Sequence, residues 1–323
     1  MRNSALIFQR AAAISAFAAV AAGCSSSGIP TGNSAASYGA LANGHGAHSR
    51  APHNDARGWI SADAKKKKGK HLIYWGNFDT STIAIYSSKG VNGKEEGQIT
   101  TGVSEPERLF VDKQYNVYST NIGNDTITAY HPGQTTPFLT ISDGVNSPTG
   151  LTVDAAGTVY CANVGNGTVT VYPKGVTTPS LTIPSSSPEY LATDAKDNLY
   201  VSSGDGILEY APGSTSGTNL NLPGGGNAIE VDKKGNVIVV NGGEIEYFPK
   251  GSTQPSNEIP VSGSPFALSL SGNEKQLYVS SEVSVPFVIQ NVAYPKGTAL
   301  SNKLTTGAGL WPLAVSPDNA LGK

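Results

Sequence analysis

The sequence predicts an all-β protein: a six-bladed β-propeller of four-stranded blades, with the ring closed by the C-terminal strand joining the N-terminal blade. Three observations support this prediction. Strand-like words recur with a period of about forty residues. The words are of four kinds that follow one another in a fixed order. The first kind is missing at the start of the repeat region and stands alone at its end. The 38 glycines among 323 residues suit short strands joined by tight turns.

The first kind of word is a five-residue apolar strand that ends in a small polar residue. It occurs as RLFVD (108–112), GLTVD (150–154), YLATD (190–194), AIEVD (228–232), ALSLS (267–271) and PLAVS (312–316). As the most apolar word, it should form the strand nearest the propeller axis. Its second residue is always Leu or Ile, and these side chains should form a buried layer between blades.

Three further words complete each repeat. The second is a strand such as TVYCAN (158–163), and the third ends in tyrosine and a turn, as in VTVYPKG (169–175). A weaker fourth strand is clearest in TTPFLTI (135–141). Four strands per repeat at this period indicate a propeller blade.

The ends of the repeat predict how the ring closes. LIYWGN (72–77) matches the second word but has no first word before it, and PLAVS is a first word without successors. PLAVS should therefore be the inner strand of the first blade, which leaves no open sheet edge around the ring.

The pattern P-x-x-L-x-V-D-x-x-G-N-x-Y-x-x-N resembles NHL-repeat propellers and the wider TolB-like and gluconolactonase-like six-bladed group. The resemblance covers residues 71–323, which we expect to form the propeller domain. It implies the fold and leaves the activity open, because the same fold carries unrelated sites.

The N-terminus resembles the signal peptide of a bacterial lipoprotein. Residues 1–23 have a basic start, and the apolar stretch Ala11–Ala22 is too short to span a bilayer. VAAGC resembles a lipobox, in which Cys24 is lipidated and becomes the mature N-terminus. Ser25 then favours the outer membrane in a Gram-negative host. An ordinary signal peptide with a chance cysteine is the alternative.

Residues 24–70 are expected to form a flexible tether that ends in a lysine run. The segment carries Ser, Gly, Ala and Asn without periodicity. KKKKGK (65–70) is either solvated or in contact with anionic lipid head groups. This organisation places the propeller in the cell envelope.

Composition excludes several functions. With 14% charged residues and a net charge of −2, the chain has no broad positive field for nucleic acid. Cys161 is the one cysteine besides Cys24, so it is expected to be a small buried hydrophobe rather than part of a disulfide or zinc site. The predicted propeller holds only His71 and His131, which disfavours Ser–His–Asp catalysis.

Four aspartates recur at the end of the inner strand: Asp112, Asp154, Asp194 and Asp232. A catalytic carboxylate cluster is one interpretation. Because a residue repeated in most blades does the same job in each, we expect them instead to accept hydrogen bonds from the backbone of the following turn.

The loops that enter the inner strands should line one mouth of the axial channel. Their variable residues form the predicted ligand-binding rim: Glu107, Arg108, Thr149, Glu189, Tyr190, Asn227, Phe266 and Trp311. A mixture of aromatic and charged groups suits a small molecule, a glycan or a protein partner. A solvated rim with hydrophobes that cap the core is the alternative.

The gluconolactonase-like resemblance implies a divalent cation on the axis, held by Glu, Asn and Asp. At the matching positions this chain has oxygen-bearing Glu107, Glu189 and Asn227, which could hold Ca²⁺, but Thr149 and Phe266 break the set. We therefore expect a non-catalytic binding protein without a cofactor. A metal-dependent, lactonase-like hydrolase and a structural envelope protein are the alternatives.

Replacement of Cys24 by alanine tests the predicted anchor. Acyl chains on Cys24 would hold the protein on a membrane, so the Cys24→Ala variant should leave the membrane fraction, as measured by fractionation and mature mass. An unchanged mass and membrane fraction would contradict lipidation.

Overall fold

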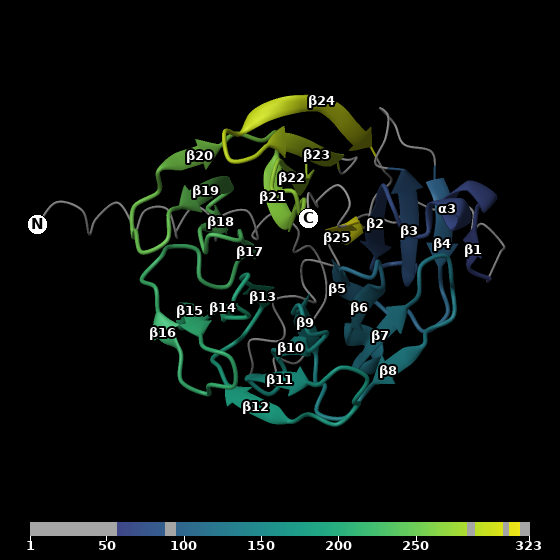
Figure 1. The fold of residues 1–323 in the computed structure, drawn as a ribbon, viewed down its shortest axis with the longest axis horizontal. Coiled ribbons are helices and arrows are strands. Elements are labelled where there is room, and N and C mark those ends of the chain that lie inside the picture. Colours follow the sequence, from purple (N-terminus) through teal and green to yellow (C-terminus); the bar gives the residue numbers. More distant parts are fainter. Residues whose placement is uncertain (1–56, 88–94, 283–287, 306–309, 317–323) are drawn as a thin grey trace, which may run out of the picture. The chain divides into compact units, whose positions relative to one another are not determined.

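The computed structural model describes residues 57–87, 95–282, 288–305 and 310–316, so the predicted signal peptide and most of the predicted tether lie outside the described residues. Six antiparallel sheets surround a central axis and form a β-propeller (Figure 1). Five sheets have four strands, and the sheet that closes the ring has five. The predicted fold class is confirmed.

Each blade runs from an inner strand at the axis to an outer strand at the periphery of the propeller. Blade 1 consists of β25 (Leu310–Val315), β2 (Leu72–Asn77), β3 (Thr82–Ser87), β4 (Glu95–Ile99) and β1 (Trp59–Ile60). Blade 2 consists of β5 (Pro106–Val111), β6 (Val117–Asn121), β7 (Thr126–Tyr130) and β8 (Leu139–Ile141), with a 3-10 turn, η2 (Ile122–Asn124), after β6. Blade 3 consists of β9 (Pro148–Val153), β10 (Val159–Asn163), β11 (Thr168–Tyr172) and β12 (Leu181–Pro184).

The remaining blades repeat this plan. Blade 4 consists of β13 (Tyr190–Thr193), β14 (Leu199–Ser203), β15 (Gly206–Tyr210) and β16 (Thr218–Asn219). Blade 5 consists of β17 (Ile229–Val231), β18 (Val237–Asn241), β19 (Glu244–Phe248) and β20 (Asn257–Ile259). Blade 6 consists of β21 (Ser264–Leu270), β22 (Gln276–Glu282), β23 (Val288–Ala293) and β24 (Thr298–Thr305). Successive inner strands contact one another, and β21 contacts β25, so the ring is complete.

A hydrophobic cluster fills each of the six interfaces between blades. Each cluster contains the Leu or Ile at the second position of one inner-strand word. These side chains are all at most 2% exposed: Leu109, Leu151, Leu191, Ile229, Leu268 and Leu313. The predicted layer between blades is confirmed, and its burial drives the blades together.

The recurring aspartates hold the turns that follow the inner strands, as predicted. In Asp232, Oδ1 accepts hydrogen bonds from the N–H groups of Lys234 and Asn236, both at 2.9 Å. Its Oδ2 accepts from Asn236 Nδ2 at 2.7 Å and from Tyr294 OH at 2.8 Å. Asp112, Asp154 and Asp194 bond their own turns in the same way. These carboxylates are therefore structural acceptors.

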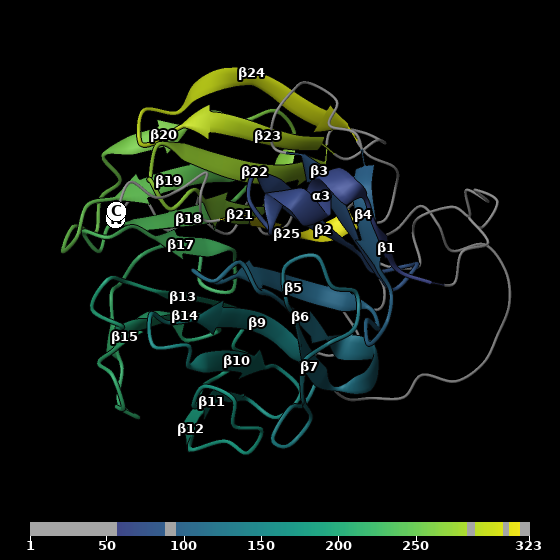
Figure 2. The same cartoon turned by 45° about the vertical axis from the view of Figure 1, so that its right-hand side comes forward.

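The end of the predicted tether belongs to the folded unit, so the propeller unit begins earlier than residue 71. β1 pairs with β4, and the helix α3 (Ala62–Lys67) also lies beside β4 (Figure 2). Ser61 caps α3 by accepting from the Ala64 N–H at 3.0 Å. Lys67, within the lysine run, forms an ion pair with the largely buried Glu96. The described residues include no helix with the length and apolarity needed to cross a membrane.

The ring closes where β25 pairs with β2, as predicted. Trp75 lies opposite Leu313, and Ile73 lies opposite Val315. Directly after β25, Ser316 forms two hydrogen bonds with Leu72 at the start of β2. Its N–H donates to Leu72 O at 3.0 Å, and its Oγ accepts from the Leu72 N–H at 3.0 Å. The two ends of the propeller are thus joined by hydrogen bonds and by buried apolar side chains.

Replacement of Leu313 tests this closure. Leu313 is 1% exposed and packs between blades 6 and 1, so Leu313→Ala should lower the free energy of unfolding by about 2–5 kcal/mol, a large part of a typical stability of about 5–15 kcal/mol. Chemical denaturation measures the change. Val176→Ala, at a side chain that is 42% exposed, is the control, and equal losses in both variants would contradict the closure.

Candidate functional site

The structure places the predicted rim residues at the start of the inner strands, but few of their side chains are open to solvent. Arg108 and Thr149 are buried, at 4% and 7% exposure. Asn227 is exposed. Glu107, Glu189, Tyr190 and Phe266 are half-buried. Trp311 belongs to β25, and its side chain lies outside the described residues.

The two described aromatic residues of this rim are partly committed to the core. Tyr190 packs against the clusters on both sides of blade 5. Phe266 packs against the cluster between blades 6 and 1. Tyr190 also lies under the guanidinium of Arg108, with Cζ 5.3 Å from the ring centroid. Both rings therefore contribute to the packing between blades.

Two carboxylates of the rim influence each other. Burial raises the pKa of Glu107 from an ordinary 4.5 to about 7, and the negative charges of Glu189 and Glu105 add to the increase. The Glu189 carboxylate also lies beside the turn before β17, since a Cβ on Gly226 would be 3.7 Å from it. Such a pair of carboxylates attracts protons or cations.

The remaining rim groups do not complete a calcium site. Thr149 Oγ1 donates to Pro188 O at 3.0 Å, and the side-chain amide of Asn227 donates to Gly224 O at 3.3 Å. Calcium takes six to eight oxygen ligands. Among the described residues, no group of three or more His, Cys, Asp and Glu is placed to hold a metal. The donor set therefore does not fit the cation that the gluconolactonase-like resemblance implies.

Arg108 reaches across the axis. It leaves β5 of blade 2, and its Nη2 lies 3.9 Å from Oε1 of Glu230 on β17 of blade 5, which faces blade 2 across the ring. Nε and Nη1 of Arg108 are buried without a hydrogen-bond partner. Burial raises the pKa of Glu230 to about 7, although Arg108 and the Leu270 N–H oppose the increase. Arg108 contacts both Glu230 and Tyr190, so these three side chains meet near the axis.

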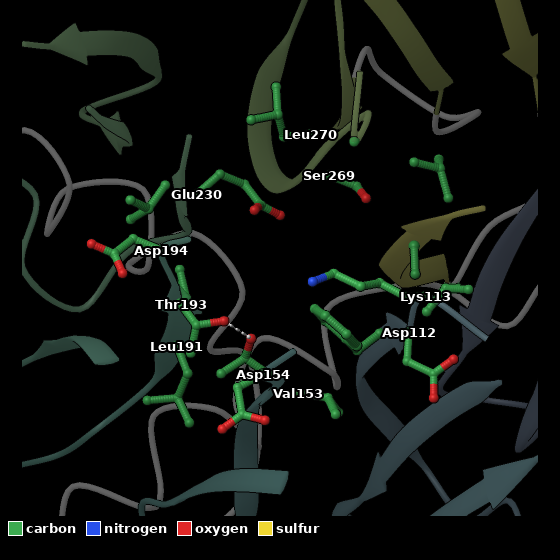
Figure 3. Close-up of a pocket in the computed structure, with 18 of the residues that line it drawn as sticks. Asp112, Lys113, Val153, Asp154, Leu191, Thr193, Asp194, Glu230, Ser269 and Leu270 are labelled. Atoms are coloured by element: carbon green, nitrogen blue, oxygen red, sulfur yellow. Dashed lines mark hydrogen bonds between the residues drawn. The ribbon is translucent and has the colours of Figure 1, made fainter. Parts of the chain in front are cut away.

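A cavity of about 300 Å³ lies on the axis beside Arg108 and Glu230. Arg108 and Glu230 form its floor, and the turns after the inner strands form its mouth, where Lys113 is exposed. The carboxylates of Asp112 and Asp154 turn away from the centre, whereas the Lys113 amine and the Glu230 carboxylate point into it (Figure 3). Of the predicted rim residues whose side chains the structure describes, Arg108 alone lines the cavity.

The cavity exists because of one position in the repeat. The third residue of every inner-strand word lines it: Phe110, Thr152, Ala192, Glu230, Ser269 and Ala314. Most of these side chains are small, and Glu230 is the one that carries a charge. The sequence-based prediction missed Glu230 and Lys113. A carboxylate at a position that is uncharged in the other five repeats was the available signal.

Comparisons with known proteins support the fold. No family model matches the chain, and no curated protein matches it significantly. Among solved structures, a chain in the crystal structure of a nidogen/laminin complex is similar, with a TM-score of 0.61 and 17% identity. The match covers 76% of this chain and 98% of that chain. The protein is a six-bladed β-propeller.

Replacement of Glu107 by glutamine tests the electrostatics of the rim. Because the folded protein holds the Glu107 proton up to a pH of about 7, the unfolded chain binds fewer protons between pH 4.5 and 7, and stability falls as the pH rises through this range. Glu107→Gln removes this loss. The variant should melt above the wild type at pH 8 and with it at pH 4, whereas the exposed-site control Glu258→Gln should match the wild type at both. A Glu107→Gln variant that is no more stable at pH 8 would contradict the raised pKa.

Proposed function

We propose that the protein is a lipid-anchored, extracytoplasmic binding protein that holds a small ligand in its axial cavity without chemical change. The observation that carries the proposal is the buried guanidinium of Arg108 in the cavity floor, with Nε and Nη1 unpaired. Buried donors of a charged group that lack hydrogen-bond partners are costly, and a ligand that supplies acceptors offsets that cost. The cavity, about 300 Å³, falls at the lower end of small-molecule sites.

The cellular setting is part of the same proposal. The lipobox-like VAAGC motif supports an anchor at Cys24 and a place in the cell envelope, on the outer membrane of a Gram-negative host. The repeat pattern supports a place among NHL-repeat, TolB-like or gluconolactonase-like propellers. The similar solved structure is a complex of two proteins, nidogen and laminin, which is compatible with a protein partner elsewhere on the propeller surface.

Binding is favoured over catalysis by the chemistry of the described groups. Cys161 is fully buried, and burial raises its pKa, so it is not a nucleophile. The four recurring aspartates are occupied by their turns. The incomplete donor set around Glu107 and Glu189 disfavours the metal-dependent lactonase alternative.

The proposal is tested by filling the cavity. Ser269 lines the cavity (Figure 3), so Ser269→Phe should abolish the binding of small molecules that ligand-observed NMR detects in a fragment set of carboxylates, amines, amino acids and polyols. Asn227→Ala, at the opposite mouth, is the control and should leave binding unchanged.

Other outcomes would assign a different function. If fragments still bind the Ser269→Phe variant but do not bind the Tyr190→Ala variant, the binding site lies at the predicted rim instead. One calcium site in calorimetry, lost together with lactone hydrolysis in Glu189→Ala, would favour the lactonase alternative. A set without any binder would contradict a small-molecule site.

A further inference from the structure

The floor of the axial cavity carries two opposite charges that do not satisfy each other. Nη2 of Arg108 and Oε1 of Glu230 are 3.9 Å apart, which is longer than a hydrogen bond. Arg108 is 4% exposed, and its Nε and Nη1 have no partner. The guanidinium also lies over the Tyr190 ring, and Tyr190 does not line the cavity. The guanidinium therefore has donors to spare for a ligand.

The chemistry of the two groups defines the ligand. A guanidinium pairs best with a carboxylate, which can accept two parallel hydrogen bonds. A simple carboxylate placed on Arg108 would also lie beside the Glu230 carboxylate, and the two negative charges would repel each other. An ammonium group next to the ligand's carboxylate removes this conflict, because it donates to Glu230. The two charged groups of the ligand must then be attached to the same carbon atom, as they are in an α-amino acid.

The walls and the size of the cavity fit the same class of molecule. Above the charged floor, part of the lining is apolar and includes Phe110, Ala192 and Leu270. Lys113 stands at the mouth, with its amine pointing inward (Figure 3). A volume of about 300 Å³ has room for one amino acid with its side chain toward the mouth.

We infer that the axial cavity binds a free α-amino acid, with its carboxylate on Arg108 and its ammonium group on Glu230. The inference rests on the proposed function and names the class of ligand. The apolar walls favour an aliphatic side chain, and the role of Arg108 is to bind the carboxylate rather than to stabilise the propeller.

The experiment compares matched probes on the wild-type protein at pH 8, where Glu230, with its pKa of about 7, is ionised. Thermal shift with the twenty common L-amino acids identifies the best binder, expected to be aliphatic such as leucine. Calorimetry then compares leucine with 4-methylpentanoate, which lacks the amino group, and with 3-methylbutylamine, which lacks the carboxylate. Each analogue should bind at least about tenfold more weakly than leucine.

Variants assign the two charges. Glu230→Gln should weaken leucine binding at least about tenfold but leave the affinity for 4-methylpentanoate unchanged or higher. Arg108→Gln should weaken both. Glu258→Gln, at an exposed site on β20, is the matched control and should bind leucine as the wild type does. The analogue comparison needs no variant, so it holds even if Arg108→Gln does not fold.

Each contrary result has a distinct meaning. If 4-methylpentanoate binds as tightly as leucine, the cavity takes simple carboxylates, and the amino-acid inference fails while the binding function stands. If no amino acid shifts the melting temperature but another fragment binds in a Ser269→Phe-sensitive manner, the inference also fails alone. If no probe of any class binds the cavity, both fail.

Discussion

The pairing of β25 with β2 is the contact on which the rest of the propeller depends. Each blade buries its two faces against its neighbours, so a ring with one blade undone would expose two interfaces at once. Ala314 packs in the cluster between blades 1 and 2, and Leu313 packs in the cluster between blades 6 and 1. The same strand satisfies the hydrogen bonds of β2, and Ser316 ends the pairing with bonds to Leu72.

Closure of the ring also decides what lies on the axis. Six inner strands of the same kind meet there, and their second residues turn into the interfaces between blades. The third residues line the channel, and because most of them are small, a cavity remains. Arg108 and Glu230 come from opposite blades and meet across this space. Neither charge would be buried in an isolated blade.

The two mouths of the channel differ in how the residues of their loops and turns pack. Gly150 lets β9 approach the loop before β13, since a Cβ there would be 2.6 Å from Glu189 O. Near the entry mouth, the Tyr190 OH donates to Phe266 O at 3.5 Å, and the Tyr190 ring lies under Arg108. At the other mouth, the aspartates draw their carboxylates into tight turns and leave the axis open. The cavity therefore lies toward the mouth where the repeat is most regular.

The repeat by itself determined the strands, the turns, the buried leucine layer and the closure by the C-terminal strand, because each of these depends on neighbours in sequence or on the periodic pattern. Asp232, for example, finds its main partners within the next four residues. Only the tertiary structure decided that Arg108 crosses the axis to Glu230, that the rim aromatics join the core, and that Lys67 ties α3 to Glu96. The direction and depth of an inner-strand side chain depend on how six blades pack together. A local sequence pattern carries no information on how far apart residues of different blades lie.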